Sequence, residues 1–130
     1  DGIASRGLGD VYKRQILTGG ELRRLSQTMV GPLSSAVLNQ VRVDKAFMGT
    51  MGFCLMNGLT TTDPNEAFVK SLVAEHARQV ILLADSSKAE KVSFARFSEW
   101  KQIDLLISDD GLTEVLAKSL RKLGLVVRLC

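Results

Sequence analysis

The chain has 130 residues, of which 45% are hydrophobic and 24% charged. A chain of this length is ordinarily one domain with a real core, and this composition excludes a disordered protein. The formal charge of +3 is small and the basic side chains are scattered, so charge alone does not indicate a nucleic-acid-binding surface.

Two further absences narrow the class of protein. No apolar run reaches about 18 residues, the length that spans a membrane, and no signal peptide opens the chain. The two cysteines, Cys54 and Cys130, lack the spacing of a zinc site, and the chain has one histidine. We therefore expect no metal, no cofactor, no membrane contact, two buried free thiols and a reducing cytoplasmic location.

The N-terminal residues 1–15 contain three glycines and several charges without a sustained apolar period. We expect a non-native or disordered leader there and place the start of the domain at residue 16. Ile16–Thr18 then predicts a short strand. Gly19 and Gly20 follow it, and their backbone N–H groups suit a phosphate or carboxylate, although a simple turn is a commoner use of two glycines.

The next stretch changes from an unassigned segment to a helix and a strand. Residues 21–30 indicate no element, and Gly31-Pro32 breaks the chain before a helix predicted over 33–41 from the spacing of its apolar residues. Val43–Met48 predicts a strand, interrupted by Asp44, whose charge on its own favours a solvent-facing position. A loop with Gly49, Gly52 and Gly58 follows.

A second helix begins after a clear start signal. Asp63 has the position of an N-cap, Pro64 lies in the first turn, and Glu66 stands three residues after the cap. This is a capping-box arrangement, and it gives Glu66 a structural explanation beside any functional one. The apolar stripe of this helix ends before the next strand.

Residues 80–84 are apolar and predict a strand buried on both faces, after which the sequence turns polar at Asp85-Ser86-Ser87-Lys88. In open α/β sheets ligands bind outside the carboxyl ends of strands, so this stretch is a candidate ligand site. The alternative is that Asp85 starts a turn, the serines bond local backbone, and Lys88 is a solvated charge.

The remaining chain continues the alternation of strands and helices. Phe94, Phe97 and Trp100 predict a core cluster or a subunit contact. A strand is predicted over 103–107, a helix over 112–123 and a last strand over 125–129, and Ser108–Gly111 repeats the polar change at a strand end. Such alternation predicts right-handed crossovers and a parallel sheet with helices on its faces.

Seven short motifs together resemble the effector-sensing domain of DeoR-type bacterial transcription regulators, over about residues 16–130. In order they are Thr18-Gly19-Gly20, Val30-Gly31-Pro32, Val43 to Gly49, Gly58-Leu59-Thr60, Glu66-Ala67 with Lys70, Leu83 to Lys88, and Ile107-Ser108-Asp109. Departures are Ala89-Glu90, where the family often has Phe-Gly, and Ser108, where threonine is usual. The helix-turn-helix domain and a Gly-Thr-Thr phosphate loop of the family would precede residue 16.

The resemblance implies an α/β domain with an open, mostly parallel sheet and helices on both faces, similar to ribose-5-phosphate isomerases and incomplete at its N-terminus. It further implies a phosphorylated sugar or sugar alcohol as effector, homo-oligomers, and contact with DNA only through the missing domain. Lys88 with Gly19 and Gly20 would hold phosphate. The full predicted binding set is Gly19, Gly20, Asp44, Gly49, Gly52, Glu66, Asp85 and Lys88.

The similarity to isomerases leaves an enzyme as one alternative. Aligned by eye, the isomerase aspartate and lysine fall on Phe47 and Asn57, so two catalytic side chains are absent while Asp44 and Glu66 are kept. Losing the lysine removes the charge that would stabilise an enediolate oxygen. We therefore expect no enzymatic activity and no catalytic residues. An oligomerisation module that binds no ligand is the other alternative.

Overall fold

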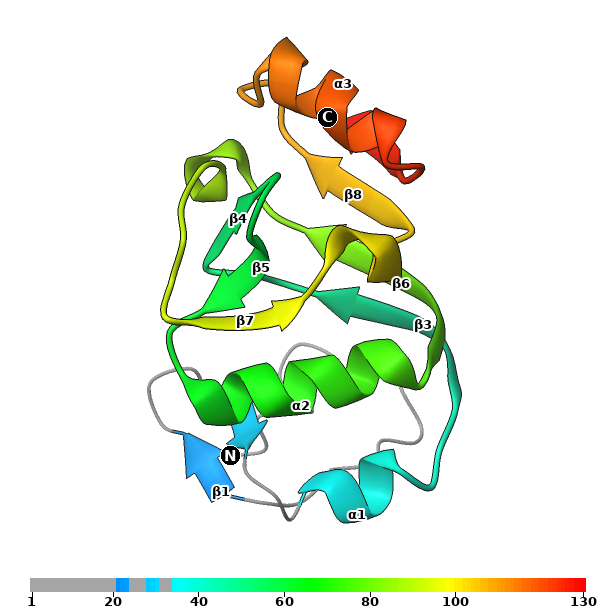
Figure 1. The fold of residues 1–130 in the computed structure, drawn as a ribbon. Helices are drawn as coiled ribbons and strands as arrows, with labels where there is room; N and C mark the ends of the chain where they lie inside the picture. Colours follow the sequence, from blue (N-terminus) through cyan, green and yellow to red (C-terminus); the bar gives the residue numbers. More distant parts are fainter. Residues whose placement is uncertain (1–20, 24–27, 31–33) are drawn as a thin grey trace, which may run out of the picture.

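The computed structural model describes residues 21–23, 28–30 and 34–130 (Figure 1). The predicted leader, the strand at 16–18 and the loop at Gly19-Gly20 lie outside the described residues. The elements in chain order are β1 (Glu21–Arg23), β2 (Thr28–Val30), α1 (Ser35–Leu38), β3 (Val43–Met48), β4 (Gly52–Cys54), β5 (Gly58–Thr61), α2 (Pro64–Glu75), β6 (Ala77–Leu83), η3 (Ser86–Lys88), β7 (Ala95–Ser98), η4 (Trp100–Gln102), β8 (Leu105–Ser108), α3 (Glu114–Lys122) and β9 (Val126–Leu129).

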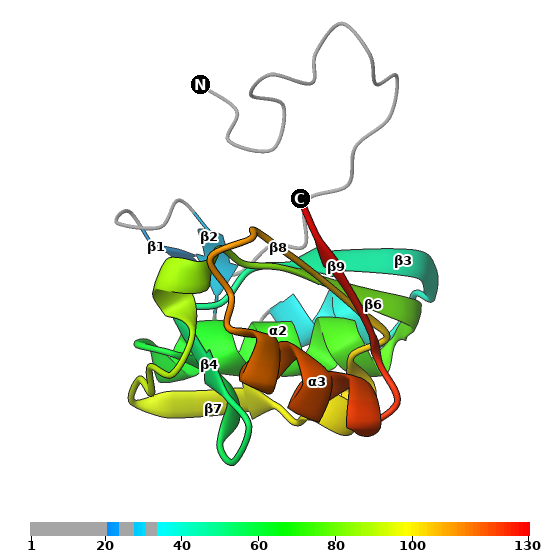
Figure 2. The same cartoon turned by 90° about the horizontal axis from the view of Figure 1, so that it is seen from above.

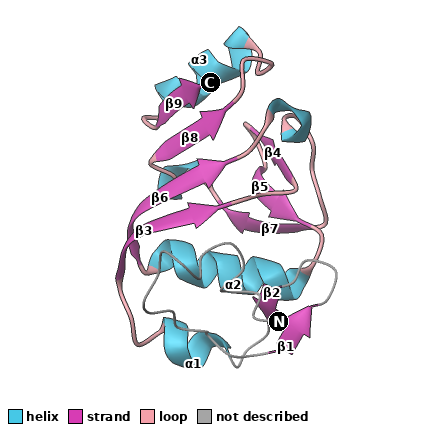
Figure 3. Ribbon diagram, turned by 180° about the vertical axis from the view of Figure 1, so that it is seen from behind, coloured by secondary structure: helices cyan, strands magenta, loops and turns pink. Residues whose placement is uncertain are grey.

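A four-stranded parallel sheet is the central element, with the strand order β3-β6-β8-β9 (Figure 3). The α/β class predicted from the alternation of elements is confirmed. Because the strands follow one another in sequence order, right-handed crossovers carry every connection over the same face. Accordingly α2, α3 and the strands β4 and β7 lie together on one side of this sheet (Figure 2).

The two faces of the parallel sheet differ in burial, as the period of two along a strand requires. Leu82, Leu106 and Val127 point into the core and are buried. On the other face Phe47 is 65% exposed, and Leu83 and Val126 are about half exposed. The sequence predicts helices on both faces, whereas the described helices α2 and α3 pack on the core face.

A second, antiparallel sheet with the order β4-β5-β7 packs against the core face. The sequence predicts only a glycine-containing loop at 49–58, because two strands of three and four residues are too short to show a period. Every residue of β4 and β5 is buried. Gly58 has a φ of +70°, a left-handed conformation that glycine adopts without strain.

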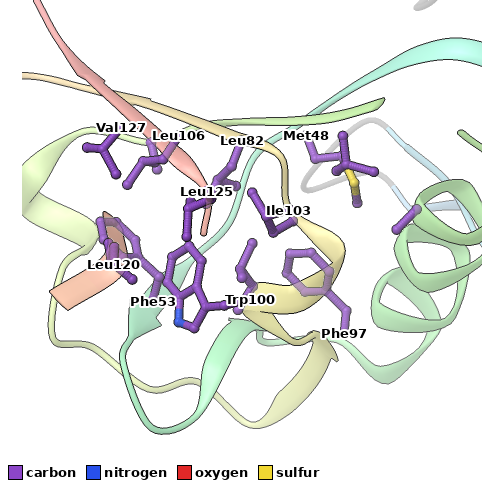
Figure 4. Close-up of a cluster of buried hydrophobic side chains, with 14 of the residues drawn as sticks. Met48, Phe53, Leu82, Phe97, Trp100, Ile103, Leu106, Leu120, Leu125 and Val127 are labelled. Carbon is purple, nitrogen blue, oxygen red and sulfur yellow. The ribbon is translucent and has the colours of Figure 1, made fainter. Parts of the chain in front are cut away.

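The core lies between the two sheets (Figure 4). The rings of Phe53 and Trp100 meet edge to face, with centroids 6.0 Å apart and an interplanar angle of 85°. The Trp100 Nε1–H group donates a hydrogen bond of 2.8 Å to the Cys54 carbonyl oxygen. Phe97 and Trp100 are buried as predicted, but Phe94 is 83% exposed and does not join them.

Three other local predictions are corrected. The hairpin of β1 and β2 forms where no element was assigned, and α1 spans four residues rather than 33–41. The side chain of Asp63 makes no capping bond to α2, although α2 begins at Pro64 as predicted. Cys54 is a buried free thiol as expected, but Cys130 is exposed.

Within the described ranges, none of the helices combines the length and the apolar character needed to cross a bilayer.

The packing predicts a large loss of stability for Leu82→Ala. Leu82 is 0% exposed at the centre of the core, so its truncation removes buried methyl groups and leaves a cavity. We expect the free energy of unfolding to fall by about 2–5 kcal/mol, measured by urea denaturation. Val115→Ala on the exposed side of α3, where the side chain is 78% exposed, is the control. Equal losses for the two variants would contradict this description of the core.

Candidate functional site

The carboxyl ends of the four parallel strands form one edge of the sheet. Met48 of β3 pairs with Leu82 of β6, and Ser108 of β8 pairs with Leu129 of β9. Gly49, Asp109 and Cys130 directly follow β3, β8 and β9 at this edge, and Asp85 is the second residue after β6. Two carboxyl groups from neighbouring strands therefore come together, as the rule for open α/β sheets predicts.

Asp85 caps the short helix η3. Its carboxylate accepts a hydrogen bond of 2.9 Å from the Ser87 N–H and a second from the Ser87 hydroxyl. These bonds, the hydroxyl first, hold the pKa of Asp85 below its ordinary value, with a smaller contribution from the charge of Lys88. Asp85 thus starts a turn, and the same turn places Lys88 at the end of η3.

Asp109 joins the exit of β8 to the exit of β6. Its Oδ2 accepts a hydrogen bond of 2.9 Å from the Ser86 N–H, and its Oδ1 accepts one of 2.8 Å from the Gly111 N–H. The pKa of Asp109 is lowered, chiefly by the bond from the Ser86 backbone. A Cβ at position 111 would stand 2.5 Å from the Ser86 Oγ, so a larger residue there would displace the Ser86 side chain.

A surface cavity of about 330 Å³ opens beside these two carboxylates. It is lined by Leu83, Ala84, Asp85, Ile107, Ser108, Asp109 and Cys130. Because no basic side chain belongs to this lining, the cavity suits hydroxyl groups better than phosphate. A second cavity, of about 240 Å³, lies beside η4 and the end of α3, at the amino ends of β8 and β9.

Lys88 is a cation at the exit of β6. It ends η3 and is half-buried. Within the described part of the chain its ammonium forms no hydrogen bond or ion pair, although it lies close enough to Asp85 to affect that carboxyl. Its three N–H donors therefore remain available to an anion.

Glu66 and Gly49 belong to the neighbouring exit, that of β3. Glu66 lies in the first turn of α2 and is 7% exposed. Lys70, one turn later, donates a hydrogen bond of 3.0 Å to the Gly49 carbonyl oxygen. The structure thus brings Gly49 near α2, and it places Asp85 and Lys88 on η3 at the adjacent strand.

Asp44 and Gly52 have different positions from those predicted. Met48 of β3 is paired with Leu82 of β6. Asp44 lies four residues before Met48 and Asp85 lies three residues after Leu82, so the two carboxyl groups are about 20 Å apart along the strand direction. Asp44 is exposed in the first half of β3, away from the edge. At Gly52 a Cβ would stand 2.4 Å from the Lys91 carbonyl oxygen, so protein backbone fills the space that was assigned to a ligand.

Sequence reasoning missed two residues of this region. Asp109 comes soon after a predicted strand and two residues before Gly111, so the sequence indicates a position at a strand end. Its bond to Ser86 could not be predicted, because it depends on which strands are neighbours. Lys70 stands four residues after Glu66, the spacing that places two side chains on one side of a helix. That spacing alone does not reveal the contact with Gly49.

Residues 9–110 match the family model of the DeoR C-terminal sensor domain. The chain belongs to this family. Similar proteins include the HTH-type transcriptional regulator GlpR of Haloferax volcanii, 37% identical over 85% of this chain and 44% of that protein. The putative aga operon transcriptional repressor of Escherichia coli O157:H7 is 32% identical over 86% of this chain and 42% of its own length.

A lactose phosphotransferase system repressor of Staphylococcus epidermidis is 33% identical over 78% of this chain and 40% of its own length. The chain thus spans less than half the length of these relatives. It is a sensor domain of the kind found in transcription regulators, and the DeoR resemblance inferred from its motifs is confirmed.

The bonds of Asp109 predict a specific pH dependence of stability. A carboxyl whose pKa is lower in the folded state stabilises the fold above its unfolded pKa, near 3.9, and this contribution is lost as the pH falls through the folded pKa. We expect Asp109→Asn to be less stable than the original chain at neutral pH, with the difference shrinking below about pH 4. Urea denaturation at several pH values measures it.

Asp110→Asn is the matched control, because Asp110 is the exposed neighbour of Asp109 and forms no hydrogen bond within the described ranges. A pH profile that Asp109→Asn leaves unchanged would show that the carboxylate does not hold the two strand exits together.

Proposed function

We propose that this sensor domain binds a phosphorylated sugar at the carboxyl edge of the parallel sheet, and that occupancy controls DNA binding by a helix-turn-helix domain outside the 130 residues. The relatives support the second half, since three of them are named as transcription regulators or repressors, one of an aga operon and one of a lactose phosphotransferase system. Such a protein acts in the cytoplasm, where its DNA lies.

The observation that carries the proposal is the cation at position 88. An ammonium at a strand exit, without a partner in the described part of the chain, is a ready donor of charge-assisted hydrogen bonds to phosphate. The N–H groups of Ser86 and Ser87 are already bonded to Asp109 and Asp85. Lys88 is therefore the phosphate contact, with Gly19-Gly20 and the family's Gly-Thr-Thr loop as expected helpers.

The sugar hydroxyls would be accepted by carboxylates. Asp85 and Asp109 border a cavity whose described lining holds no basic side chain. Both bonds to Asp85 end on its Oδ1, so its Oδ2 remains an acceptor, and each oxygen of Asp109 keeps a second lone pair after one bond. Glu66 at the neighbouring exit is the third acceptor. Asp109 takes the role predicted for Asp44, which the register puts at the other end of β3.

Regulation follows from thermodynamic linkage. A ligand that binds one arrangement of a homo-oligomer better than another shifts the population toward it, and with it the spacing of the attached DNA-binding domains.

The geometry does not favour the isomerase alternative. Asn57, the expected lysine position, lies in the β4–β5 turn, where its N–H groups donate to the Cys54 Sγ. This turn borders the cavity at the amino ends of the strands, opposite the proposed site. Phe47, the expected aspartate position, is exposed on the face of the sheet away from the core.

A thermal-shift screen of sugar phosphates tests the proposal. The probes are ribose 5-phosphate, fructose 1-phosphate, glycerol 3-phosphate and inorganic phosphate, added to the chain alone and to the chain preceded by the Gly-Thr-Thr segment of a relative. At a hundredfold excess over its dissociation constant, a ligand should stabilise the fold by roughly 2–3 kcal/mol. Lys88→Ala should abolish this stabilisation.

Lys118→Ala is the control, because Lys118 is exposed on α3 and paired with Glu114. If no sugar phosphate stabilises either form, the domain is an oligomerisation module and the proposal is wrong. Turnover of ribose 5-phosphate would instead establish the enzyme.

A further inference from the structure

A second lysine reaches the carboxyl edge from α2. The Lys70 ammonium lies 3.0 Å from the carbonyl oxygen of Gly49, the residue that follows β3. The last residue of β3, Met48, pairs with Leu82 of β6, and Lys88 follows β6 on η3. Lys70 from α2 and Lys88 from η3 thus lie beside the exits of two hydrogen-bonded strands, and neighbouring parallel strands are about 4.8 Å apart.

The surroundings of the Lys70 ammonium are costly for a charge. Burial lowers the pKa of Lys70, and the nearby Glu66 carboxylate opposes that shift without cancelling it. The ammonium also lies 4.9 Å from the centre of the Phe97 ring, whose face attracts a cation. A partly buried cation is expected to have acceptors for those of its N–H groups that water does not reach.

The described residues supply Lys70 with one such acceptor. The Gly49 carbonyl oxygen takes one of the three N–H groups, and no other described residue accepts a hydrogen bond from the other two. The loop cannot rearrange easily to provide more, because the Thr50 hydroxyl is bonded to the Gly52 and Thr60 carbonyl oxygens. The remaining donors suit a group that arrives from outside.

There is room for such a group beside Gly49. A Cβ built at this position meets no heavy atom within 4 Å, in contrast to Gly52 and Gly111, where it would collide with neighbouring atoms. Gly49 is exposed. Open space thus borders the carbonyl to which Lys70 is bonded.

We propose that Lys70 is a second cationic contact for the effector and shares its phosphate group with Lys88. This inference rests on the proposed function and names the residue that completes its anion site. A phosphate monoester carries a charge of about −1.5 to −2 at neutral pH, so two ammonium groups match it where one leaves it under-compensated. Its three terminal oxygens offer acceptors to both lysines.

The test compares Lys70→Met and Lys70→Arg with the original chain, by calorimetric titration with the sugar phosphate that stabilises it most. Lys70→Met should weaken binding about tenfold or more, the usual loss for one hydrogen bond between charged groups. Lys70→Arg keeps the charge and should restore most of the affinity. Lys118→Met, a remote exposed lysine, should bind as the original chain does.

A spectroscopic measurement separates ligand contact from a purely structural role. In the original chain with ¹⁵N-labelled lysine, the ammonium signal that is missing in Lys70→Arg should shift when the sugar phosphate is added. A signal that stays in place would overturn the inference, even if Lys70→Met fails to fold.

The two proposals fail in different ways. Unchanged affinity in Lys70→Met, together with lost affinity in Lys88→Ala, overturns the role of Lys70 and keeps the sensor. No binding of any sugar phosphate by the original chain or its extended form overturns both.

Discussion

The packing of the short antiparallel sheet onto one face of the parallel sheet is the constraint on which the rest of the structure depends. Phe53 of β4 and Trp100 of η4 meet at its centre, and Trp100 also binds the Cys54 carbonyl oxygen. This contact fixes β4 beside the segment that follows η3. There Phe53 forms a parallel β-bridge with Ala89, and its carbonyl oxygen accepts a hydrogen bond of 2.7 Å from the Glu90 N–H. Core packing thus determines where the Lys88 backbone lies.

At the carboxyl edge the acidic and the basic side chains differ in how many hydrogen bonds they form. Asp85 and Asp109 accept hydrogen bonds from η3 and from the turn at Gly111, and these bonds lower the pKa of each carboxyl. Lys88 and Lys70 have fewer bonds than donors among the described residues. In the proposed site the anions would mainly hold the backbone and the cations would remain for a ligand, an arrangement that suits recognition of phosphate.

Much of this could be predicted from sequence, and the failures have identifiable causes. Residues 80–84 predict a strand because a short, branched apolar run that ends abruptly in polar residues is typical of one, and α2 and α3 are predicted from apolar residues at helical spacing. The β4–β5 hairpin was missed because its seven residues are all buried and show no alternation. The sequence predicts a candidate site at the exit of β6 and includes Asp44 in it from a motif, because a motif does not reveal the strand register that puts Asp44 at the opposite end.

The close approach of Gly52 to Lys91 has a mechanical consequence. Gly52 of β4 lies against the Lys91 backbone. Five residues before Lys91, the Ser86 N–H donates a hydrogen bond to Asp109, which follows β8. The segment that contains Lys88 therefore contacts the parallel sheet at one end and the antiparallel sheet at the other, and these contacts restrict its conformation. A ligand bound at the proposed site would therefore act on both sheets at once, and a small shift of this segment would change how the two sheets pack.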